Sequence, residues 1–277
     1  MGKRYLKKEV EQANIEYHTK MADFYDKDQP HNMPENVRRV DAMIKKLAEK
    51  CGGGLLLDIG CGTGFVLNIA KKYFDRVTGI DFTQAMLDKV DLSSGNIDLI
   101  LGNASKMPFN DESFDVCTAY AFLHHLPVFD SIFREVFRCL KRGGIFATDM
   151  DPNYYCWREI SRLDKGNYSE MLQREISSIK DVYSELEGKY GFDKRTAELA
   201  EYQKAIRGGI KEESLVASLQ KVGFSEVHFE YQWFLGQGWV LHNVSEEATK
   251  HIDEQLRKLL PLSRPLFKYF SLTALKV

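Results

Sequence analysis

The sequence lacks the features that mark a membrane-spanning, secreted or nucleic-acid-binding protein. No segment approaches the roughly 18 uncharged apolar residues of a membrane-spanning helix, and residues 1–12 contain no apolar core of a signal peptide. The formal net charge of −2 provides no general attraction to nucleic acid or to an anionic membrane. We therefore expect a cytoplasmic protein with no membrane span and no nucleic-acid partner.

Cysteine is scarce and scattered. The five cysteines are Cys51, Cys61, Cys117, Cys139 and Cys156. They are odd in number and form neither a Cys-x-x-Cys motif nor a cluster with histidine. This pattern favours free thiols in a reducing compartment and gives no sign of a zinc site, so we expect no metal.

What the sequence does contain is an alternation of short apolar runs and helical segments. Five runs are predicted as strands, at residues 55–59, 76–81, 97–101, 114–120 and 145–150. Helices are predicted between them, and two further strands are expected at 226–234 and 267–276. Alternating strands and helices are typical of βαβ units. We expect an α/β fold with a doubly wound, mostly parallel seven-stranded sheet.

Two segments lie outside this alternation. Residues 1–50 are predicted as two helices around a loop at 28–34 that contains two prolines. Residues 151–210 are charged and aromatic, with a long amphipathic helix predicted at 168–190, and are interpreted as a helical cap insert. The core is then residues 51–150, completed by residues 211–277.

Residues 55–64, LLLDIGCGTG, are the most informative stretch. Gly60, Gly62 and Gly64 follow a buried strand and precede a helix that begins at Phe65. A strand that turns through alternate glycines into a helix lets a ligand lie against bare backbone, so this segment predicts a nucleotide-type cofactor site. A Walker A loop is excluded because no Lys-Ser or Lys-Thr pair follows, and Phe65 replaces the third glycine of a dinucleotide fingerprint. A tight turn without a ligand is the plainer alternative.

Five segments in this order resemble the motifs of class I S-adenosylmethionine-dependent methyltransferases. They are LLLDIGCGTG at 55–64, Ile80-Asp81, GNASKMPF at 102–109, the run from Phe114 to Leu126 that contains LHHL, and LKRGG at 140–144. The resemblance covers residues 15–150 and the last two strands, and is nearest to the small-molecule domain type of ubiquinone and menaquinone biosynthesis. Residues 151–210 resemble no segment that we can name.

The resemblance implies that S-adenosylmethionine is the cofactor and S-adenosylhomocysteine the product. Asp81 would accept both ribose hydroxyls, Phe82 would lie against the adenine, and Asn103, where the family usually has aspartate, would accept from the adenine amino group. The alternative for Asp81 is an acid that caps the next helix. The predicted cofactor-binding residues are Asp58, Gly60, Cys61, Gly62, Gly64, Asp81, Phe82, Met86, Asn103, Ala104, Tyr120 and Tyr25.

Candidate catalytic residues are few. Methyl transfer from a sulfonium is an in-line displacement, so the protein mainly aligns the reactants and excludes water. A base is needed only where the nucleophile carries a proton. His124 and His125, at the end of the fourth strand, are the predicted catalytic residues, with packing or helix capping as the alternative. Tyr17, His18 and Tyr25 are further candidates, because the N-terminal segment resembles a lid over the cofactor, with packing of the amphipathic helix as the alternative.

The acceptor is predicted only as a class. Asp151-Pro152-Asn153-Tyr154 resembles the loop of methyltransferases that act on the amines of nucleobases, but it follows the fifth strand instead of the fourth. We therefore expect a small or medium organic acceptor, with a carbon, oxygen or nitrogen nucleophile, and a monomer or homodimer. The cap's aromatic residues either line the acceptor pocket or form the cap's own core. The alternatives are a regulatory protein that binds the cofactor without turnover and, less favoured, a nucleotide-dependent oxidoreductase.

Overall fold

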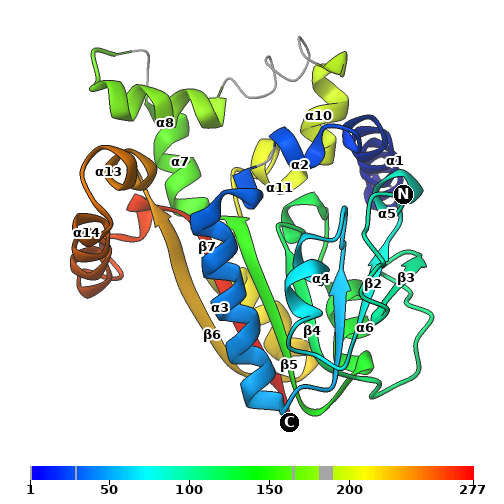
Figure 1. Cartoon of the computed structure of the whole chain (residues 1–277). Helices are drawn as coiled ribbons and strands as arrows, with labels where there is room; N and C mark the ends of the chain where they lie inside the picture. The colour runs from blue at the N-terminus through cyan, green and yellow to red at the C-terminus, as the bar shows by residue number, and fades with distance from the viewer. Residues whose placement is uncertain (1, 29, 164–165, 181–189) are drawn as a thin grey trace.

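The centre of the fold is a seven-stranded sheet with the strand order β3-β2-β1-β4-β5-β7-β6 (Figure 1). The structure is a computed structural model, and it describes residues 2–28, 30–163, 166–180 and 190–277. The strands are β1 (Leu55–Ile59), β2 (Arg76–Asp81), β3 (Ile97–Leu101), β4 (Phe114–Tyr120), β5 (Leu140–Pro152), β6 (Phe224–Phe234) and β7 (Phe267–Lys276). β1 to β5 run parallel, and β7 pairs antiparallel with both β5 and β6. The predicted doubly wound, mostly parallel sheet is confirmed.

Both faces of the sheet are covered by helices, which explains why its central strands carry apolar residues on both faces. Alternate residues of β1 enter two different cores: Leu56 packs with α3 (Pro34–Cys51) and α4 (Phe65–Ala70), whereas Leu57 packs with α6 (Asp130–Cys139) and α12 (Glu212–Val222). Helix α5 (Gln84–Leu87) follows β2. Because the strands β1 to β5 are parallel, their carboxyl ends meet at one edge, where ligands bind in open α/β sheets.

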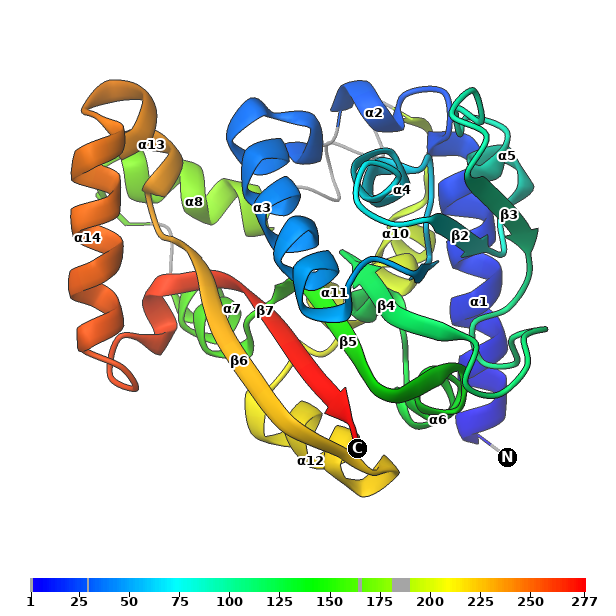
Figure 2. The same ribbon diagram turned by 60° about the horizontal axis from the view of Figure 1, so that its bottom comes forward.

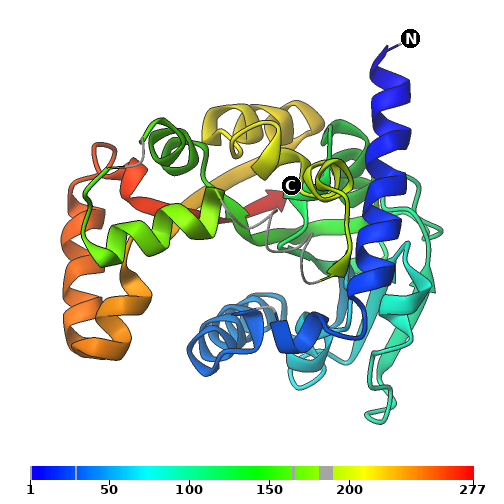
Figure 3. The ribbon, with the colours of Figure 1, turned by 90° about the horizontal axis from the view of Figure 1, so that it is seen from above.

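Helical segments surround this edge. The N-terminal part consists of α1 (Gly2–Met21), α2 (Tyr25–Asp28) and the short 3-10 helix η1 (Pro30–Asn32). The cap contains α7 (Tyr154–Arg162), α8 (Glu170–Lys180), α10 (Lys194–Ala200) and α11 (Tyr202–Ala205). The helices α13 (Gln237–Asn243) and α14 (Glu246–Lys258) lie between β6 and β7. Figures 2 and 3 show α1 along one side of the molecule and α14 at the opposite side.

Three elements differ between the prediction and the structure. The fifth strand, predicted at 145–150, begins at Leu140, which already pairs with β4, and a register shift follows before Ile145. Helix α13, which begins at Gln237, was not predicted. The long helix predicted at 168–190 begins at Glu170 and is described only to Lys180, and its remainder lies outside the described residues. Within the described ranges, no helix is both long and apolar enough to cross a membrane.

Candidate active site

The glycine turn after β1 is held by backbone and carboxylate hydrogen bonds. Gly60, Gly62 and Gly64 all have positive φ values, of 68°, 52° and 89°, which few other residues adopt without strain. The N–H groups of Gly60 and Cys61 donate to the carbonyl of Ile80 at 2.8 and 3.2 Å. The turn is therefore tied to the end of β2, and its remaining backbone faces outward from the sheet edge.

Asp81 clamps this turn from the end of β2. Its Oδ2 accepts the N–H of Gly62 at 3.0 Å, and its Oδ1 accepts the N–H of Thr83 at 2.9 Å. Asp81 is buried, with 8% of its surface exposed, and it lines a cavity at the strand ends. Each carboxylate oxygen can accept more than one hydrogen bond, so Asp81 can hold the turn and still accept a ligand hydroxyl.

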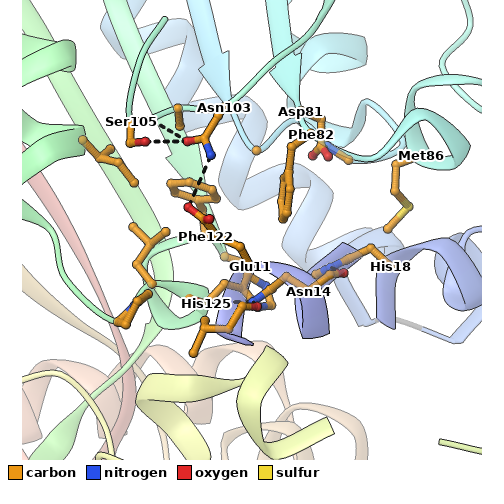
Figure 4. Close-up of a pocket in the computed structure, with 18 of the residues that line it drawn as sticks. Glu11, Asn14, His18, Asp81, Phe82, Met86, Asn103, Ser105, Phe122 and His125 are labelled. Carbon is orange, nitrogen blue, oxygen red and sulfur yellow. Dashed lines mark hydrogen bonds between the residues drawn. The ribbon is translucent and has the colours of Figure 1, made fainter. Parts of the chain in front are cut away.

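The strand-end cavity is the space enclosed by this turn, the ends of β2 to β4 and helix α1 (Figure 4). Its empty volume is about 850 Å³ including the open mouth. The predicted cofactor residues that line it are Tyr25, Gly60, Gly62, Asp81, Phe82, Met86, Asn103, Ala104 and Tyr120. Figure 4 shows Phe82 and Met86 on the same side of the cavity as Asp81.

Three predicted residues lie beside the cavity, not on its wall. Asp58 is buried beneath the turn, where Thr118 Oγ1 donates to its Oδ1 at 2.7 Å, and burial raises the pKa of this carboxyl to about 7. Cys61 is buried, and its Sγ lies beside Gly79 of β2. Gly64 is the N-cap of α4, packed against Val90. Their contribution to cofactor binding stays a prediction.

Helix α1 supplies four residues that the sequence did not single out. Lys7, Val10, Glu11 and Asn14 line the strand-end cavity on the side opposite the sheet, together with His18, which was a candidate from the sequence. Two weak polar contacts connect α1 to the loop after β3. Asn103 Nδ2 donates to Glu11 Oε1 at 3.3 Å, and the ammonium of Lys7 lies 3.5 Å from Ser105 Oγ. The sequence signals were the helical period of residues 5–17 and the resemblance of this segment to a lid over the cofactor, and neither indicates these four residues.

The residues of the strand-end cavity fit a ligand with hydroxyl and amino groups. Asn14 is 3% exposed, and its Oδ1 is buried without a hydrogen-bond partner in the structure. A buried orphan acceptor in a cavity wall is matched by an N–H donor of a ligand. A Cβ on Gly62 would have no atom within 4 Å, so open cavity lies directly beside the backbone there. A carboxylate such as Asp81 can accept hydroxyls and Asn14 Oδ1 can accept from an amino group, so the chemistry of these residues fits S-adenosylmethionine.

Asn103 is less free than the sequence indicated. Its Oδ1 already accepts the N–H and the hydroxyl of Ser105, at 2.8 and 2.7 Å. An adenine amino group would have to share this oxygen or displace the serine hydroxyl. The predicted contact is therefore possible only as one of several bonds to the same atom.

A second cavity adjoins the first on the cap side. This cap cavity has an empty volume of about 1230 Å³ including its mouth, and it is walled by α3, α8, α11, the end of β6 and the start of β7. The residues that line both cavities are His18, Tyr25, Tyr120, Ala121 and His125. The two cavities thus meet at the end of β4, where a donor in one would reach an acceptor in the other.

Strained backbone is concentrated around the cap cavity. Ala121, Met150 and Trp233 have positive φ values of 49°, 61° and 58°, and all three line it. Non-glycine residues in this region cost roughly 1–3 kcal/mol each and cluster at functional sites. Trp233 Nε1 and His31 Nε2 are also buried without hydrogen-bond partners. Strain and orphaned polar atoms together indicate a ligand-binding wall.

The predicted catalytic histidines lie in the 3-10 helix η2 (Leu123–His125), at the wall of the cap cavity. His124 Nδ1 lies 3.0 Å from Asp151 Oδ1, which also accepts the backbone N–H of His124 at 3.0 Å. His125 Nδ1 lies 2.7 Å from the carbonyl oxygen of Ala200. Since both partners accept hydrogen bonds, each ring donates through Nδ1 and keeps an unprotonated Nε2.

Burial keeps both rings neutral. Burial, with a smaller effect of Lys204, lowers the pKa of His124 well below its ordinary value. Burial also lowers the pKa of His125 to about 4, although the nearby Glu201 opposes this change. Burial raises the pKa of Asp151 to about 7, against the effect of the Thr148 hydroxyl that donates to Oδ2 at 2.8 Å.

The cap brings a carboxylate to the histidines. Glu201, between α10 and α11, places Oε2 3.6 Å from His124 Nε2 and 2.7 Å from the ammonium of Lys204. Burial alone would raise the pKa of Glu201, but Lys204 and then His125 hold it below its ordinary value. No spacing in the sequence connects Glu201 with His124, because 77 positions separate them and the cap folds back onto the core.

Together the fold and the site define a class I S-adenosylmethionine-dependent methyltransferase domain. Residues 57–148 match the methyltransferase domain family, which comprises β1 to most of β5. A protein of Mycolicibacterium smegmatis named "Probable S-adenosylmethionine-dependent methyltransferase" is 25% identical over 202 residues, 67% of this chain and 77% of the relative. The predicted family and cofactor are confirmed.

Further relatives support the same class. A demethylmenaquinone methyltransferase of Listeria welshimeri is 35% identical over 125 residues, 42% of this chain and 53% of that protein. The chain therefore matches about half the length of that relative. An S-adenosylmethionine-dependent methyltransferase structure from Mesorhizobium loti aligns with a TM-score of 0.56 and 18% identity, covering 89% of this chain and 100% of that one. At this identity, the likeness shows the fold.

Proposed function

We propose that this chain transfers the methyl group of S-adenosylmethionine to a small or medium organic acceptor bound in the cap cavity. The observation that carries the proposal is the meeting of the two cavities at Tyr120, Ala121 and His125, at the end of β4. A donor in the strand-end cavity and an acceptor in the cap cavity would face each other across this wall. Such alignment supplies much of the rate of an in-line displacement.

The residues of the strand-end cavity would hold the cofactor. Asp81 would accept the ribose hydroxyls while it keeps the glycine turn in place. Phe82 and Met86 would pack against the adenine, and Asn14 Oδ1 would accept from an amino group. The cofactor, when bound, supplies a methyl group on a positively charged sulfur with a neutral leaving group. The chain's own contribution is to bind, orient and exclude water.

The histidine pair would contact the acceptor's reacting group. His124 and His125 both line the cap cavity, and their Nδ1 atoms are fixed by Asp151 and by the carbonyl of Ala200. Fixed rings with free Nε2 atoms can orient a nucleophile to within the tolerance that displacement requires. Tyr17, His18 and Tyr25 lie on the same wall and would help to exclude water.

The setting of the enzyme is part of the proposal. All five cysteines are free in the structure, which supports a reducing compartment such as the cytoplasm. The acceptor would be a small molecule and not a nucleic acid, in keeping with the net charge of −2. A monomer or homodimer is expected.

Calorimetry and a turnover assay test the proposal. We expect S-adenosylmethionine and S-adenosylhomocysteine to bind with 1:1 stoichiometry and NADH not to bind. We then expect S-adenosylhomocysteine to form only when an acceptor is added. Because one relative is named a demethylmenaquinone methyltransferase, quinols and phenols belong in the first acceptor panel, beside amines and carboxylic acids. Binding of NADH but of neither sulfur compound would contradict the proposal.

A further inference from the structure

Three side chains that come from two distant parts of the chain converge beside the cap cavity. One ligating atom from each of His124, His125 and Glu201 lies within 4.8 Å of the other two. All three residues line the cap cavity, so a species bound among them would be in contact with the acceptor space. Ligands of a tetrahedral zinc ion lie at about 2.0–2.2 Å from it and therefore about 3.4 Å from one another, so the three atoms would have to approach one another by up to about 1.4 Å to hold the ion.

The groups behind the histidines are those of a metal site. A histidine that binds a metal through Nε2 almost always donates its Nδ1–H to a carboxylate or a backbone carbonyl. The Nδ1 of His124 lies 3.0 Å from the carboxylate of Asp151, and the Nδ1 of His125 lies 2.7 Å from the carbonyl oxygen of Ala200. Ala200 and Glu201 are adjacent, so one short segment of the cap fixes a ring and also supplies the carboxylate.

Lys204 is the group that would compete with a cation. Its ammonium donates to Glu201 Oε2 at 2.7 Å, and no described hydrogen bond or ion pair uses Oε1. Glu201 can therefore keep Lys204 on Oε2 and offer Oε1 to a cation, so that Lys204 would orient the ligating carboxylate.

We propose that His124, His125 and Glu201 bind one divalent transition-metal cation, such as Zn²⁺ or Mn²⁺, whose remaining coordination positions face the cap cavity. Two imidazoles and one carboxylate with open positions are a recurrent donor set for such ions. On the basis of the proposed function, the open positions would hold an oxygen of the acceptor. The site then favours acceptors with a phenol, enol or carboxylate oxygen near the methylated atom.

The test is a titration of the full chain with ZnCl₂ after treatment with EDTA and dialysis. Calorimetry is expected to show one site, and Co²⁺ in place of Zn²⁺ is expected to give the visible absorption of a low-coordinate cobalt centre. Glu201→Gln should abolish the stoichiometric site. Asp151→Asn, which removes the partner of His124, should weaken affinity by about 10- to 100-fold.

The matched control is Glu175→Gln. Glu175 is also a carboxylate of the cap-cavity wall with a lysine partner, Lys268 at 2.8 Å, but it belongs to no such histidine group among the described residues. It should leave Zn²⁺ affinity unchanged, and circular dichroism should show that all three variants are folded. Absence of a 1:1 site, or equal loss in Glu175→Gln and Glu201→Gln, overturns the proposal.

The same samples are titrated with S-adenosylmethionine. Binding of the cofactor without Zn²⁺ binding would overturn the metal site and leave the proposed methyl transfer standing. Zn²⁺ binding without cofactor binding would overturn the proposed methyl transfer and leave the metal site standing. Retained Zn²⁺ binding in Glu201→Gln would show adventitious coordination by exposed histidines such as His251, and would also overturn the site.

Discussion

Asp81 shows how one side chain can serve both the fold and the ligand. Its two oxygens hold the backbone of Gly62 and Thr83, so the acid that would bind the ribose also shapes the turn beside it. The alternative of a cap for the next helix is not borne out, because the N-cap of α5 is Thr83 and its side chain makes no capping hydrogen bond; Asp81 accepts the N–H of Thr83 itself. The structure shows the local hydrogen bonds, and the ribose contact stays a prediction.

Replacement of Asp81 by alanine should weaken the binding of S-adenosylmethionine by about 1.5–3 kcal/mol, since charge-assisted hydrogen bonds to the ribose are lost. Calorimetry measures this loss. Asp98→Ala is the control, because Asp98 is an acid on the neighbouring strand that pairs with Arg76 at the surface. Unchanged affinity in Asp81→Ala would rule out the ribose contact.

Asp58 should make stability depend on pH. Burial raises its pKa in the folded state to about 7, so the folded protein prefers the neutral carboxyl. The stability that this gives is complete below the unfolded pKa of about 4 and is lost as the pH rises to about 7. Asp58→Asn should therefore gain about 2–3 kcal/mol relative to the unsubstituted chain between pH 5 and pH 8. Urea denaturation at both pH values measures the free energy of unfolding of the two proteins. An equal difference between them at pH 5 and at pH 8 would contradict the prediction.

At the scale of the element, the turn between β1 and α4 uses its glycines in different ways. A Cβ on Gly60 would lie 2.2 Å from Phe122 Cδ2, so that position has no room for a side chain. A Cβ on Gly62 would meet nothing within 4 Å, because the cavity begins there. One glycine is required by packing and the other by the approach of a ligand.

Gly62→Ala should fold with a loss of roughly 1–2 kcal/mol, because its φ of 52° is unfavourable for alanine. Its affinity for S-adenosylmethionine should fall at least tenfold, because the methyl group occupies ligand space. Gly95→Ala is the matched control: Gly95 has a φ of 75° and open space around it, but it does not line the cavity. Equal cofactor affinities in the two variants would show that Gly62 is not in contact with the ligand.

The elements that the sequence predicted well are those with one dominant signal. β1 to β4 are short apolar runs bounded by glycine or polar residues, and their predicted bounds match the structure. Helix α13 was not predicted, because glycines at 236 and 238 are unfavourable inside a helix, whereas Gly236, with a φ of 80°, is the N-cap. Local patterns cannot separate a glycine that ends a segment from one that starts a helix.

At the scale of the whole molecule, the site depends on contacts between distant segments. Asn14 of α1 and Glu201 of the cap reach the strand ends only in the folded chain. The motifs at Asp81 and His124 could be predicted, because each is a short stretch of sequence at or just after the end of a β-strand. His18 and Tyr25 were expected only because the N-terminal segment resembles a lid, whereas Asn14 and Glu201 could not be predicted, since nothing in the sequence around them says which surface they cover.

Cofactor binding should stabilise the whole chain. A ligand at 100 times its dissociation constant adds about 2.7 kcal/mol to a folded protein that alone binds it. For a chain of this length, the melting temperature should rise by roughly 5–10 °C with S-adenosylmethionine or S-adenosylhomocysteine. Differential scanning fluorimetry measures the shift. NADH at the same concentration should give none, and a shift with NADH alone would point to another cofactor.

The wall shared by the two cavities has an evolutionary consequence. The strand-end cavity is built largely from residues 55–132 and α1, whereas much of the cap cavity comes from residues 150–269. A change in the later segments can therefore alter what is methylated without touching the donor site. Exchange of the segment between β5 and α12 for that of a relative should change the acceptor specificity of such an enzyme and leave its affinity for the cofactor unchanged.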